Sequence, residues 1–152
     1  MAVDSRAKGA RAETTVRDEL RKLTGLQWER IPASGALSAV HQLKGDLYIP
    51  GEYNHYCVEV KHYADDSLSS TYLTGVNPTL SQFWEQTVRE SGQVNKKPLL
   101  IYKYDRSKLY ACMNDLLVDQ KDYPHRYLYS HEGFYITRLE QWVSFCKPEW
   151  IK

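Results

Sequence analysis

The sequence predicts an α/β fold, a single domain in which helices flank a central mixed sheet. Two stretches, residues 10–23 and 78–91, have apolar side chains at helical spacing. Residues 56–63 alternate between polar and apolar side chains, which is typical of a strand with one buried face. Residues 99–102 form an apolar run, as expected for a strand covered on both faces. Such helices and strands pack as layers around one sheet.

Length and composition fit one domain. The chain has 152 residues, 42% of them hydrophobic, so it can bury its own core but has no room for a second full domain. No apolar run reaches about 18 residues, the length that spans a bilayer, so we expect no membrane partner. The three cysteines are far apart and form no CxxC motif, which predicts free thiols and a cytoplasmic protein. The net charge of +1 leaves any affinity for phosphate to local basic clusters.

The N-terminal part is predicted to contain a helix, a strand and a loop. The first apolar stripe is followed by Gly25, a natural helix terminator in the left-handed conformation. Residues 26–31 alternate loosely and end at Pro32, which predicts a strand. The small residues 33–36 then predict a loop with a tight backbone path.

The middle of the chain is predicted to contain a β-hairpin, a helix and two strands. Residues 47–49 end at a Pro-Gly turn and are expected to pair with the alternating segment that follows. Pro78 fits the first position of the second helix, and Gly92 is expected to end it. The apolar run after this helix predicts a central strand, and residues 109–113 predict the next one.

The C-terminal part is predicted to end in a short helix. A Tyr-rich strand pair is expected around residues 127–136, and Thr137 with Glu140 resembles a capping box at the start of the helix. We therefore expect residues 1–115 to form the core of the domain. Residues 116–152 are expected to form a strand-and-helix extension packed on that domain.

One pattern points to chemistry: Gly45-Asp46, then twelve intervening residues, then Glu59-Val60-Lys61. Side chains alternate along a strand, so Glu59 and Lys61 share one face while Val60 points to the other. If the hairpin places Asp46 across from Glu59, two hard oxygen ligands converge, which suits Mg²⁺. Such a centre hydrolyses phosphodiesters, and Lys61 would position the attacking water or offset developing negative charge.

Two further motifs accompany this pattern, KGARAE at residues 8–13 and RIPASG at residues 30–35. Together with Asp46 and the Glu-x-Lys segment, they resemble the PD-(D/E)XK nuclease superfamily, and within it the archaeal-type and phage Holliday junction resolvases. The resemblance covers roughly residues 6–104 and implies a restriction-endonuclease-like fold. The remainder of the chain matches nothing in that family.

The resemblance implies a role for each matching residue of the site. Asp46 and Glu59 are expected to be the main metal ligands, with the Val60 carbonyl as a third ligand and Lys61 as the catalytic lysine. Glu13 is expected to approach the same metal from the first helix. Its position at the edge of the apolar stripe supports this, because there it can point inward.

The resemblance also implies contacts with DNA. Ser34 is expected to lie near the scissile phosphate, with a catalytic and a DNA-binding role. Arg6, Lys8, Arg11 and Arg30 are expected to bind backbone phosphates of the duplex.

The function implied is that of a Mg²⁺-dependent endonuclease, with Mn²⁺ as a substitute metal. A homodimer would bind branched double-stranded DNA and resolve four-way junctions by symmetric paired nicks. A phage-encoded protein would do so in the host cytoplasm. Two alternatives stay open: a sequence-specific endonuclease of restriction or homing type on the same core, and a non-catalytic DNA-binding module.

Overall fold

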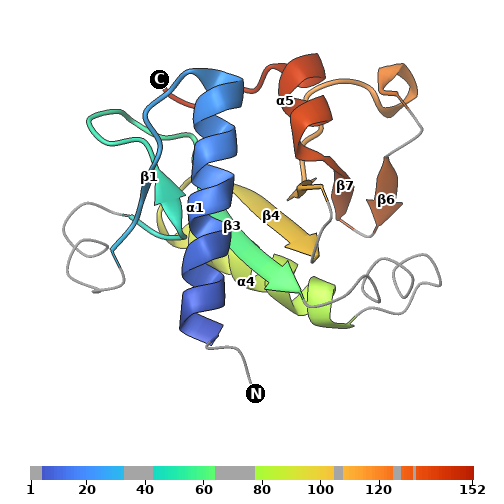
Figure 1. Ribbon diagram of the computed structural model, residues 1–152. Helices are drawn as coiled ribbons and strands as arrows, with labels where there is room; N and C mark the ends of the chain where they lie inside the picture. Colours follow the sequence, from blue (N-terminus) through green and yellow to red (C-terminus); the bar gives the residue numbers. More distant parts are fainter. Residues whose placement is uncertain (1–4, 33–42, 64–77, 105–107, 125–127, 132) are drawn as a thin grey trace.

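The computed structural model describes residues 5–32, 43–63, 78–104, 108–124, 128–131 and 133–152 (Figure 1). Of residues 5–8, 63, 78–79 and 131 it describes the backbone only. The helices and strands of the described residues are, in chain order, α1 (Ser5–Thr24), β1 (Glu29–Arg30), β2 (Leu47–Tyr48), β3 (Tyr56–Tyr63), α4 (Pro78–Gln93), β4 (Lys97–Tyr104), β5 (Tyr110–Met113), the 3₁₀ helix η1 (Gln120–Asp122), β6 (Tyr129–His131), β7 (Phe134–Arg138) and α5 (Leu139–Cys146).

The described strands form one mixed sheet in the order β1-β2-β3-β4-β5-β7-β6. The central strands β3 and β4 run parallel along their whole length, and the other neighbouring pairs run antiparallel. A parallel pair needs a crossover connection, and α4 lies in the connection between β3 and β4. The predicted mixed sheet and the predicted hairpin of β2 and β3 are both confirmed.

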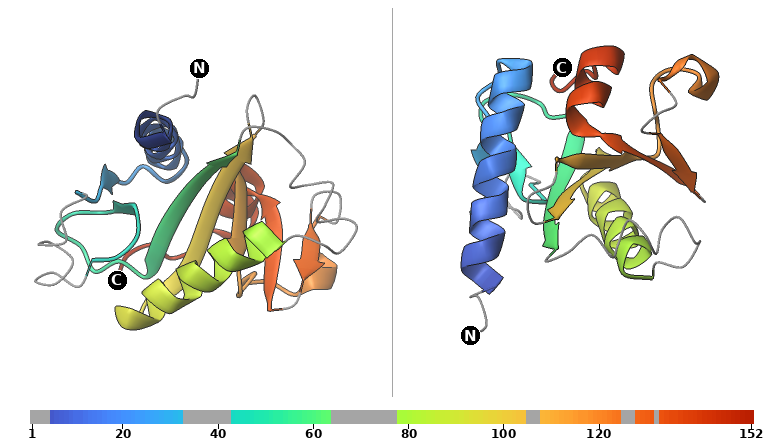
Figure 2. Two further views of the ribbon diagram at one scale, coloured as in Figure 1. Left: turned by 90° about the horizontal axis from the view of Figure 1, so that it is seen from below. Right: turned by 45° about the vertical axis from the view of Figure 1, so that its right-hand side comes forward.

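Helices α1 and α5 cover one face of the sheet, and α4 covers the other (Figure 2). Val16 of α1 and Trp142 of α5 belong to the same buried cluster as Val58 of β3. Trp84 of α4 belongs to a second cluster with Leu100 of β4. Strand β4 is therefore covered on both faces, as predicted, and replacing the fully buried Leu100 with Ala would cost about 2–5 kcal/mol.

Strand β3 presents different chemistry on its two faces. Val58 and Val60 pack in the cluster beneath α1. Glu59 is in parallel register with Leu100, whose side chain packs beneath α4. Since side chains alternate along a strand, Glu59 and Lys61 share the α4 face, as predicted.

The N-terminal elements differ in length from the prediction. Helix α1 begins at Ser5, before the predicted start, and ends at Thr24, where Gly25 takes the expected positive φ of 74°. The strand predicted for residues 26–31 is reduced to the two residues of β1. The reason is that Trp28 is buried in the core, and its indole N–H donates to Thr24 Oγ1 (3.0 Å).

The predicted capping box at Thr137 and Glu140 is wrong. Thr137 is a residue of β7, it is fully buried, and its hydroxyl shares a hydrogen bond of 2.8 Å with the Tyr123 hydroxyl. The residue before α5 is Arg138, which makes no side-chain capping bond. Thr137 therefore cannot cap α5, because it belongs to β7 and is paired with β5.

The C-terminal segment completes the same sheet and core. Strand β7 pairs with β5, β6 pairs with β7, and α5 packs beside α1. Beyond α5 the chain returns to the start of β3, where Ile151 forms a β-bridge with Asn54 and Trp150 joins the core. The division of the domain after residue 115 stays a prediction.

Two expectations from composition can be compared with the structure. The three cysteines are all unpaired, as predicted, and Cys57 and Cys112 are buried. Among the described residues, no helix has the length and apolar character needed to cross a membrane.

Candidate active site

Asp46 lies at the edge of β3, immediately before β2. Its N–H donates to the Val58 carbonyl (2.7 Å), and its Oδ2 accepts a hydrogen bond from the Val60 N–H (2.8 Å). Gly45 permits this close approach, because its φ is 93° and a Cβ there would lie 2.5 Å from the Val58 oxygen. The Asp46 carboxylate is thus fixed in the row of hydrogen bonds along β3, between the two faces of the sheet.

Glu59 contacts this aspartate from the α4 side. Only 5% of its surface is exposed. Burial is the main cause that raises its pKa to about 10, and a hydrogen bond with the Glu90 carboxyl group and the charge of Asp46 act in the same direction. When no metal ion is bound, Glu59 therefore favours its protonated form at neutral pH.

Glu13 approaches Asp46 from the α1 side. Burial and the neighbouring Asp46 carboxyl group raise the pKa of Glu13 to about 7. The Arg30 guanidinium opposes this rise, since Arg30 Nη2 lies 3.1 Å from Glu13 Oε2. Asp46 is therefore flanked by one carboxyl group from each face of the sheet, Glu59 and Glu13.

Glu90 of α4 is a site residue that the sequence motifs did not indicate. It contacts Glu59, and it accepts a long hydrogen bond from Gln86 Nε2 (3.4 Å). The hydrogen bond with Glu59 is the main cause that lowers the pKa of Glu90. A signal was available in the helical spacing, because Glu90 follows the fully buried Thr87 by three residues.

Lys61 lies on the same face of β3 as Glu59. Its Nζ is 4.8 Å from the centre of the Phe83 ring of α4, within the range of a cation–π contact. The charges of Lys61 and Lys44 also help to lower the pKa of Glu90. The predicted catalytic amine is therefore next to the carboxyl groups, at the boundary between β3 and α4.

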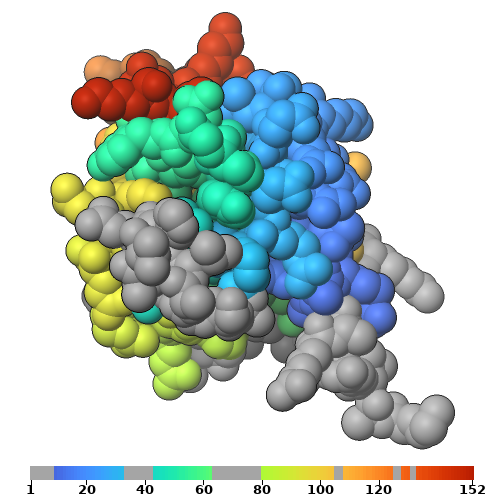
Figure 3. All heavy atoms as spheres, turned by 90° about the vertical axis from the view of Figure 1, so that its left-hand side faces the viewer, coloured from blue at the N-terminus to red at the C-terminus, as the bar shows by residue number. Residues whose placement is uncertain are grey.

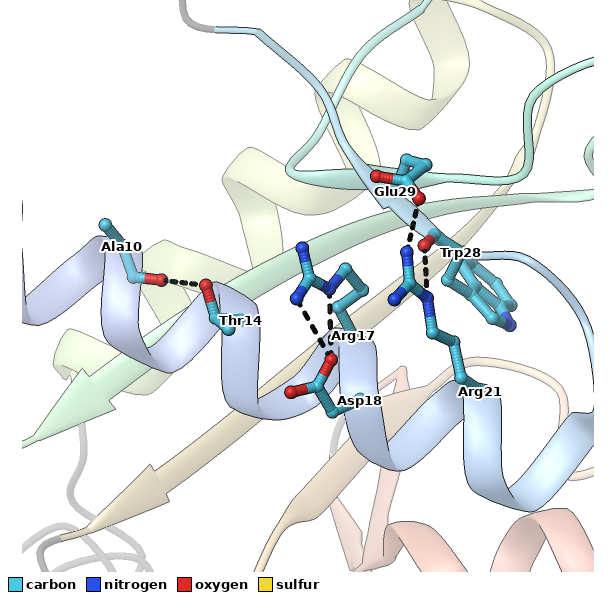
Figure 4. A network of polar contacts seen from close by, with 7 residues as sticks. All are labelled: Ala10, Thr14, Arg17, Asp18, Arg21, Trp28 and Glu29. Carbon is cyan, nitrogen blue, oxygen red and sulfur yellow. Dashed lines mark hydrogen bonds and ion pairs between the residues drawn. The ribbon is translucent and has the colours of Figure 1, made fainter.

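Helix α1 fixes the position of β1 and so of Arg30. Arg21 Nε donates to the Trp28 carbonyl (2.8 Å), and Arg21 Nη2 forms an ion pair with Glu29 (Figure 4). Arg30, the residue after Glu29, pairs with Glu13, which precedes Arg21 by eight residues on α1. Figure 3 shows the face of the molecule on which α1 lies beside the segments around β1 and β2.

The predicted DNA-binding residues are only partly placed. Ser34 lies outside the described residues. Arg6 and Lys8 are on the first turns of α1, where the structure describes the backbone only, and Arg11 is exposed on the same helix. Arg30 is beside the carboxyl groups, paired with Glu13.

The polar contacts form a continuous chain across the sheet edge. The described residues of this chain, in spatial order, are Arg30, Glu13, Asp46, Glu59, Glu90 and Gln86. Basic or amide donors stand at its ends, and carboxyl groups fill its middle. The middle is therefore the place where a bound cation would relieve the most repulsion.

The donor set fits a hard divalent cation. Asp46 and Glu59 supply carboxylate oxygens, and the Val60 carbonyl points to the Asp46 side of β3, because the N–H and C=O of one strand residue share a side. In the described part of the chain, no three His, Cys, Asp or Glu residues already stand in a metal-binding group. The carboxyl groups of Asp46, Glu13 and Glu59 make polar contacts with the Val60 N–H, with Arg30 and with Glu90, respectively.

The fold and this site define a class of protein. A mixed sheet between helices carries an aspartate at a strand edge and a Glu-x-Lys segment on the next strand, with a further carboxyl group from the first helix. This arrangement is that of the PD-(D/E)XK nucleases, the superfamily that the sequence motifs resemble.

Comparison with known proteins identifies the family. The family described as "Phage putative PDDEXK endonuclease" matches residues 4–152, and the chain belongs to it. Protein D14 of Escherichia phage T5 is 49% identical over 124 residues, which cover 78% of each of the two chains. The resemblance to PD-(D/E)XK nucleases is thereby confirmed, and the protein is a member of a nuclease family.

A solved structure is also similar over most of the chain. It is that of Hjc from Archaeoglobus fulgidus, described as a Holliday junction resolvase from an archaeal hyperthermophile. The match has a TM-score of 0.42 and 15% sequence identity, and covers 94% of this chain and 98% of Hjc.

Proposed function

We propose that this protein is a Mg²⁺-dependent endonuclease that acts on branched double-stranded DNA and resolves four-way (Holliday) junctions. The observation that supports this is the meeting of Asp46 with Glu59 from one face and Glu13 from the other, beside Lys61. Mn²⁺ is expected to replace Mg²⁺, because both ions bind carboxylate, carbonyl and water oxygens.

In this proposal Asp46, Glu59 and the Val60 carbonyl hold the metal, and Glu13 reaches the same site from α1. A bound Mg²⁺ supplies charge that stabilises the transition state and lowers the pKa of a water. Lys61 holds the attacking water or offsets negative charge that develops on the phosphate. Its short distance from the Phe83 ring limits the directions in which the amine can point.

The proposed DNA contacts come from residues of α1 and β1 and from Ser34. Arg6, Lys8, Arg11 and Arg30 bind backbone phosphates, which set the position of the duplex without reading its sequence. Ser34 lies near the phosphate that is cut. The exposure of Arg11 and the place of Arg30 next to Glu13 support this assignment.

We further propose that the protein is a homodimer. A four-way junction offers two equivalent strands, and two sites related by a twofold axis would cut both symmetrically. The two motifs at residues 8–13 and 30–35, which are similar to those of the resolvases, favour a junction over a linear duplex. The phage family and the phage relative favour action in the cytoplasm of a host cell.

A panel of labelled DNA substrates tests the proposal. The protein is incubated with Mg²⁺ and linear duplex, single-stranded, flap, three-way and four-way DNA. We expect paired symmetric cuts in the four-way junction and no cutting without metal. Cutting of one linear sequence would support a sequence-specific endonuclease instead, and binding without any cutting would support a DNA-binding module.

A further inference from the structure

The turn that follows β2 is held by hydrogen bonds from two directions. Asn54 is buried, and its Oδ1 accepts a hydrogen bond from the Ile49 N–H (2.7 Å), while its Nδ2 donates to the carbonyls of Ile49 (2.9 Å) and Glu52 (2.8 Å). The C-terminal end of the chain binds the same turn, because the Lys152 N–H donates to the Tyr53 carbonyl (3.1 Å). The backbone at Tyr53 therefore has a fixed place, although the turn projects from the molecule beyond β2 (Figure 1).

This turn presents an exposed aromatic ring. Tyr53 is the most exposed large hydrophobic residue among those that the structure describes, with 55% of its surface accessible. The His55 ring stands edge-on to it, with ring centres 5.9 Å apart, and His55 Nδ1 lies 3.1 Å from the Glu149 carbonyl oxygen. The Tyr53 ring thus has a neighbour that limits its orientations before any ligand arrives, which reduces the conformational entropy that binding would cost.

A groove of about 560 Å³ includes this ring in its wall. It is lined by Leu43, Tyr48, Ile49, Pro50, Gly51, Glu52 and Tyr53. Most of these side chains are apolar or aromatic, and the only charge among them is the Glu52 carboxylate. An anionic phosphate is therefore disfavoured in the groove, whereas a flat, uncharged ring could stack on a tyrosine and donate an N–H to the carboxylate.

The groove begins beside the proposed metal site. Tyr48 follows Asp46 by two residues, which corresponds to about 7 Å along an extended chain. Tyr48 also pairs with Glu29 of β1, the residue before Arg30. DNA that is cut at Asp46 and contacts Arg30 therefore has nucleotides within reach of the groove.

We propose that this groove binds an unstacked nucleobase of the DNA, with the Tyr53 ring as its stacking surface. This inference rests on the proposed action on branched DNA, and it adds a physical reason for selectivity. Bases beside a branch point have fewer stacking neighbours than bases inside a duplex, so displacing them costs less free energy. Stacking on an aromatic side chain contributes about 5- to 150-fold in affinity per base and depends little on sequence.

DNA affinity without metal measures this role in the absence of cleavage. We expect Tyr53→Ala to weaken binding to a four-way junction about tenfold and to leave affinity for a linear duplex unchanged, because the bases of the duplex keep their stacking partners. Tyr53→Phe should retain wild-type affinity because it keeps the ring, and Tyr53→Leu should not because it has no aromatic face. Tyr129→Ala is the matched control, since it removes an exposed tyrosine from β6, at the other edge of the sheet.

A fluorescent base analogue locates the contact. The fluorescence of 2-aminopurine depends on its stacking, so this base at the branch point should respond to binding of the wild type and Tyr53→Phe, and less to binding of Tyr53→Ala. An equal loss of affinity for junction and linear DNA, or wild-type affinity and fluorescence in Tyr53→Ala, would overturn the inference. A lower molar mass of Tyr53→Ala in light scattering would also overturn it, by assigning the groove to a second copy of the chain.

A single-stranded oligothymidylate separates this inference from the proposed function. If the wild type does not prefer branched DNA, the proposed function fails, but the groove can still be tested with bases that stack weakly on one another. Base binding then predicts weaker affinity for Tyr53→Ala than for the wild type or Tyr129→Ala. Equal affinity of the three proteins, or no binding by the wild type, would exclude a base-binding groove.

Discussion

Two carboxyl groups approach Asp46 from opposite faces of the sheet, and their surroundings differ. On the α1 face, Glu13 has a cationic partner in Arg30, and its pKa is about 7. On the α4 face, Glu59 is more deeply buried, its neighbour Glu90 is another carboxyl group, and its pKa is about 10. One face therefore offsets the charge of Glu13 with an arginine. On the other face Lys44 and Lys61 act on Glu90, and Glu59 itself favours its protonated form.

This difference indicates which face would depend more on a bound metal ion. A cation that binds between Asp46 and Glu59 takes the place of a proton and offsets charges that no arginine reaches. Glu13 gains less, because a guanidinium already offsets part of its charge. Glu59 on the α4 face is thus expected to be a main ligand beside Asp46, while Glu13 on the α1 face adjusts the site.

The largest expected effect is on cleavage. Asp46→Asn or Glu59→Gln should lower the rate by at least about 10³-fold, while Glu13→Gln should lower it by about 10- to 100-fold. All three should still bind four-way DNA in a gel-shift titration, because they remove negative charge. Cutting by the first two variants at a near wild-type rate would contradict the metal site, and equal losses in all three would remove the difference between the faces.

Lys61 should behave differently from the carboxyl groups. Lys61→Ala should lower the rate by about 10²-fold or more, with little change in metal affinity, because the amine acts on the water and the phosphate. Single-turnover cleavage and metal titration measure the two quantities separately. Lys121→Ala, a change of an exposed lysine on η1, is the matched control. Loss of metal binding in Lys61→Ala would show that its role is structural.

Glu59 and Glu13 should each make the metal-free protein less stable as the pH rises. The folded protein retains the Glu59 proton up to about pH 10, whereas the unfolded chain releases it near the ordinary value of 4.5. Stability is therefore lost from about pH 4.5 upward, and Glu13 adds to the loss between 4.5 and about 7. Glu59→Gln cannot titrate, so its stability should depend less on pH.

Glu59→Gln should also be more stable than the wild type at pH 8 by about 1–2 kcal/mol, because it removes a buried group that resists ionisation. Urea unfolding at several pH values, without metal, measures both effects. Saturating Mg²⁺ should reduce the difference in the free energy of unfolding between the wild type and Glu59→Gln. If the wild type were as stable as the variant at every pH, the pKa of Glu59 would not be raised by its surroundings.

The motif on β2 and β3 could be predicted from the sequence because it is local. A hairpin places Asp46 next to β3, and alternation alone divides Glu59 and Lys61 from Val60. Glu90 could not be found this way, because its place depends on how α4 packs across the sheet. The spacing of Glu90 from Thr87 was compatible with burial of its side chain, but it did not show that Glu90 would contact Glu59.

The errors have a common physical cause. The predicted strand of residues 26–31 is shorter than expected, and the Trp28 indole is buried in the core. Thr137 is a residue of β7 and not the cap of α5. In both cases tertiary packing prevailed over a local pattern that is worth about 1 kcal/mol. The central strand and both long helices were predicted because their apolar patterns and the packing agree.

A smaller effect is expected for the outer surface of α1. If Arg11 contacts a phosphate, Arg11→Ala should weaken binding to four-way and linear DNA alike and reduce the slope of log affinity against log salt by about one unit per contact. Preference for the junction should survive, because phosphate contacts set position and not identity. Lys121→Ala serves again as the control, and an unchanged slope for Arg11→Ala would mean that this part of α1 is only solvated surface.

The smallest expected effect concerns Arg30, the residue that makes the two faces different. The pair with Glu13 is partly exposed, with 42% of the Arg30 side chain accessible, so its removal should cost less than about 1 kcal/mol. Arg30 lowers the pKa of Glu13, so Arg30→Ala should raise that pKa further above its ordinary value. The pair exists only when Glu13 is charged, which means that the loss of Tm should be larger at pH 8 than at pH 5.

Arg17→Ala is the matched control for this measurement. Arg17 lies on the same helix and pairs with its neighbour Asp18 at 3.1 Å (Figure 4), and it is not among the groups that shift the pKa of Glu13. The effect of Arg17→Ala on Tm should be the same at pH 5 and at pH 8. If Arg30→Ala also lowers Tm by the same amount at pH 5 and at pH 8, Arg30 does not offset the charge of Glu13. The two faces of the site would then be electrostatically alike, and the reason for ranking Glu59 above Glu13 as a metal ligand would disappear.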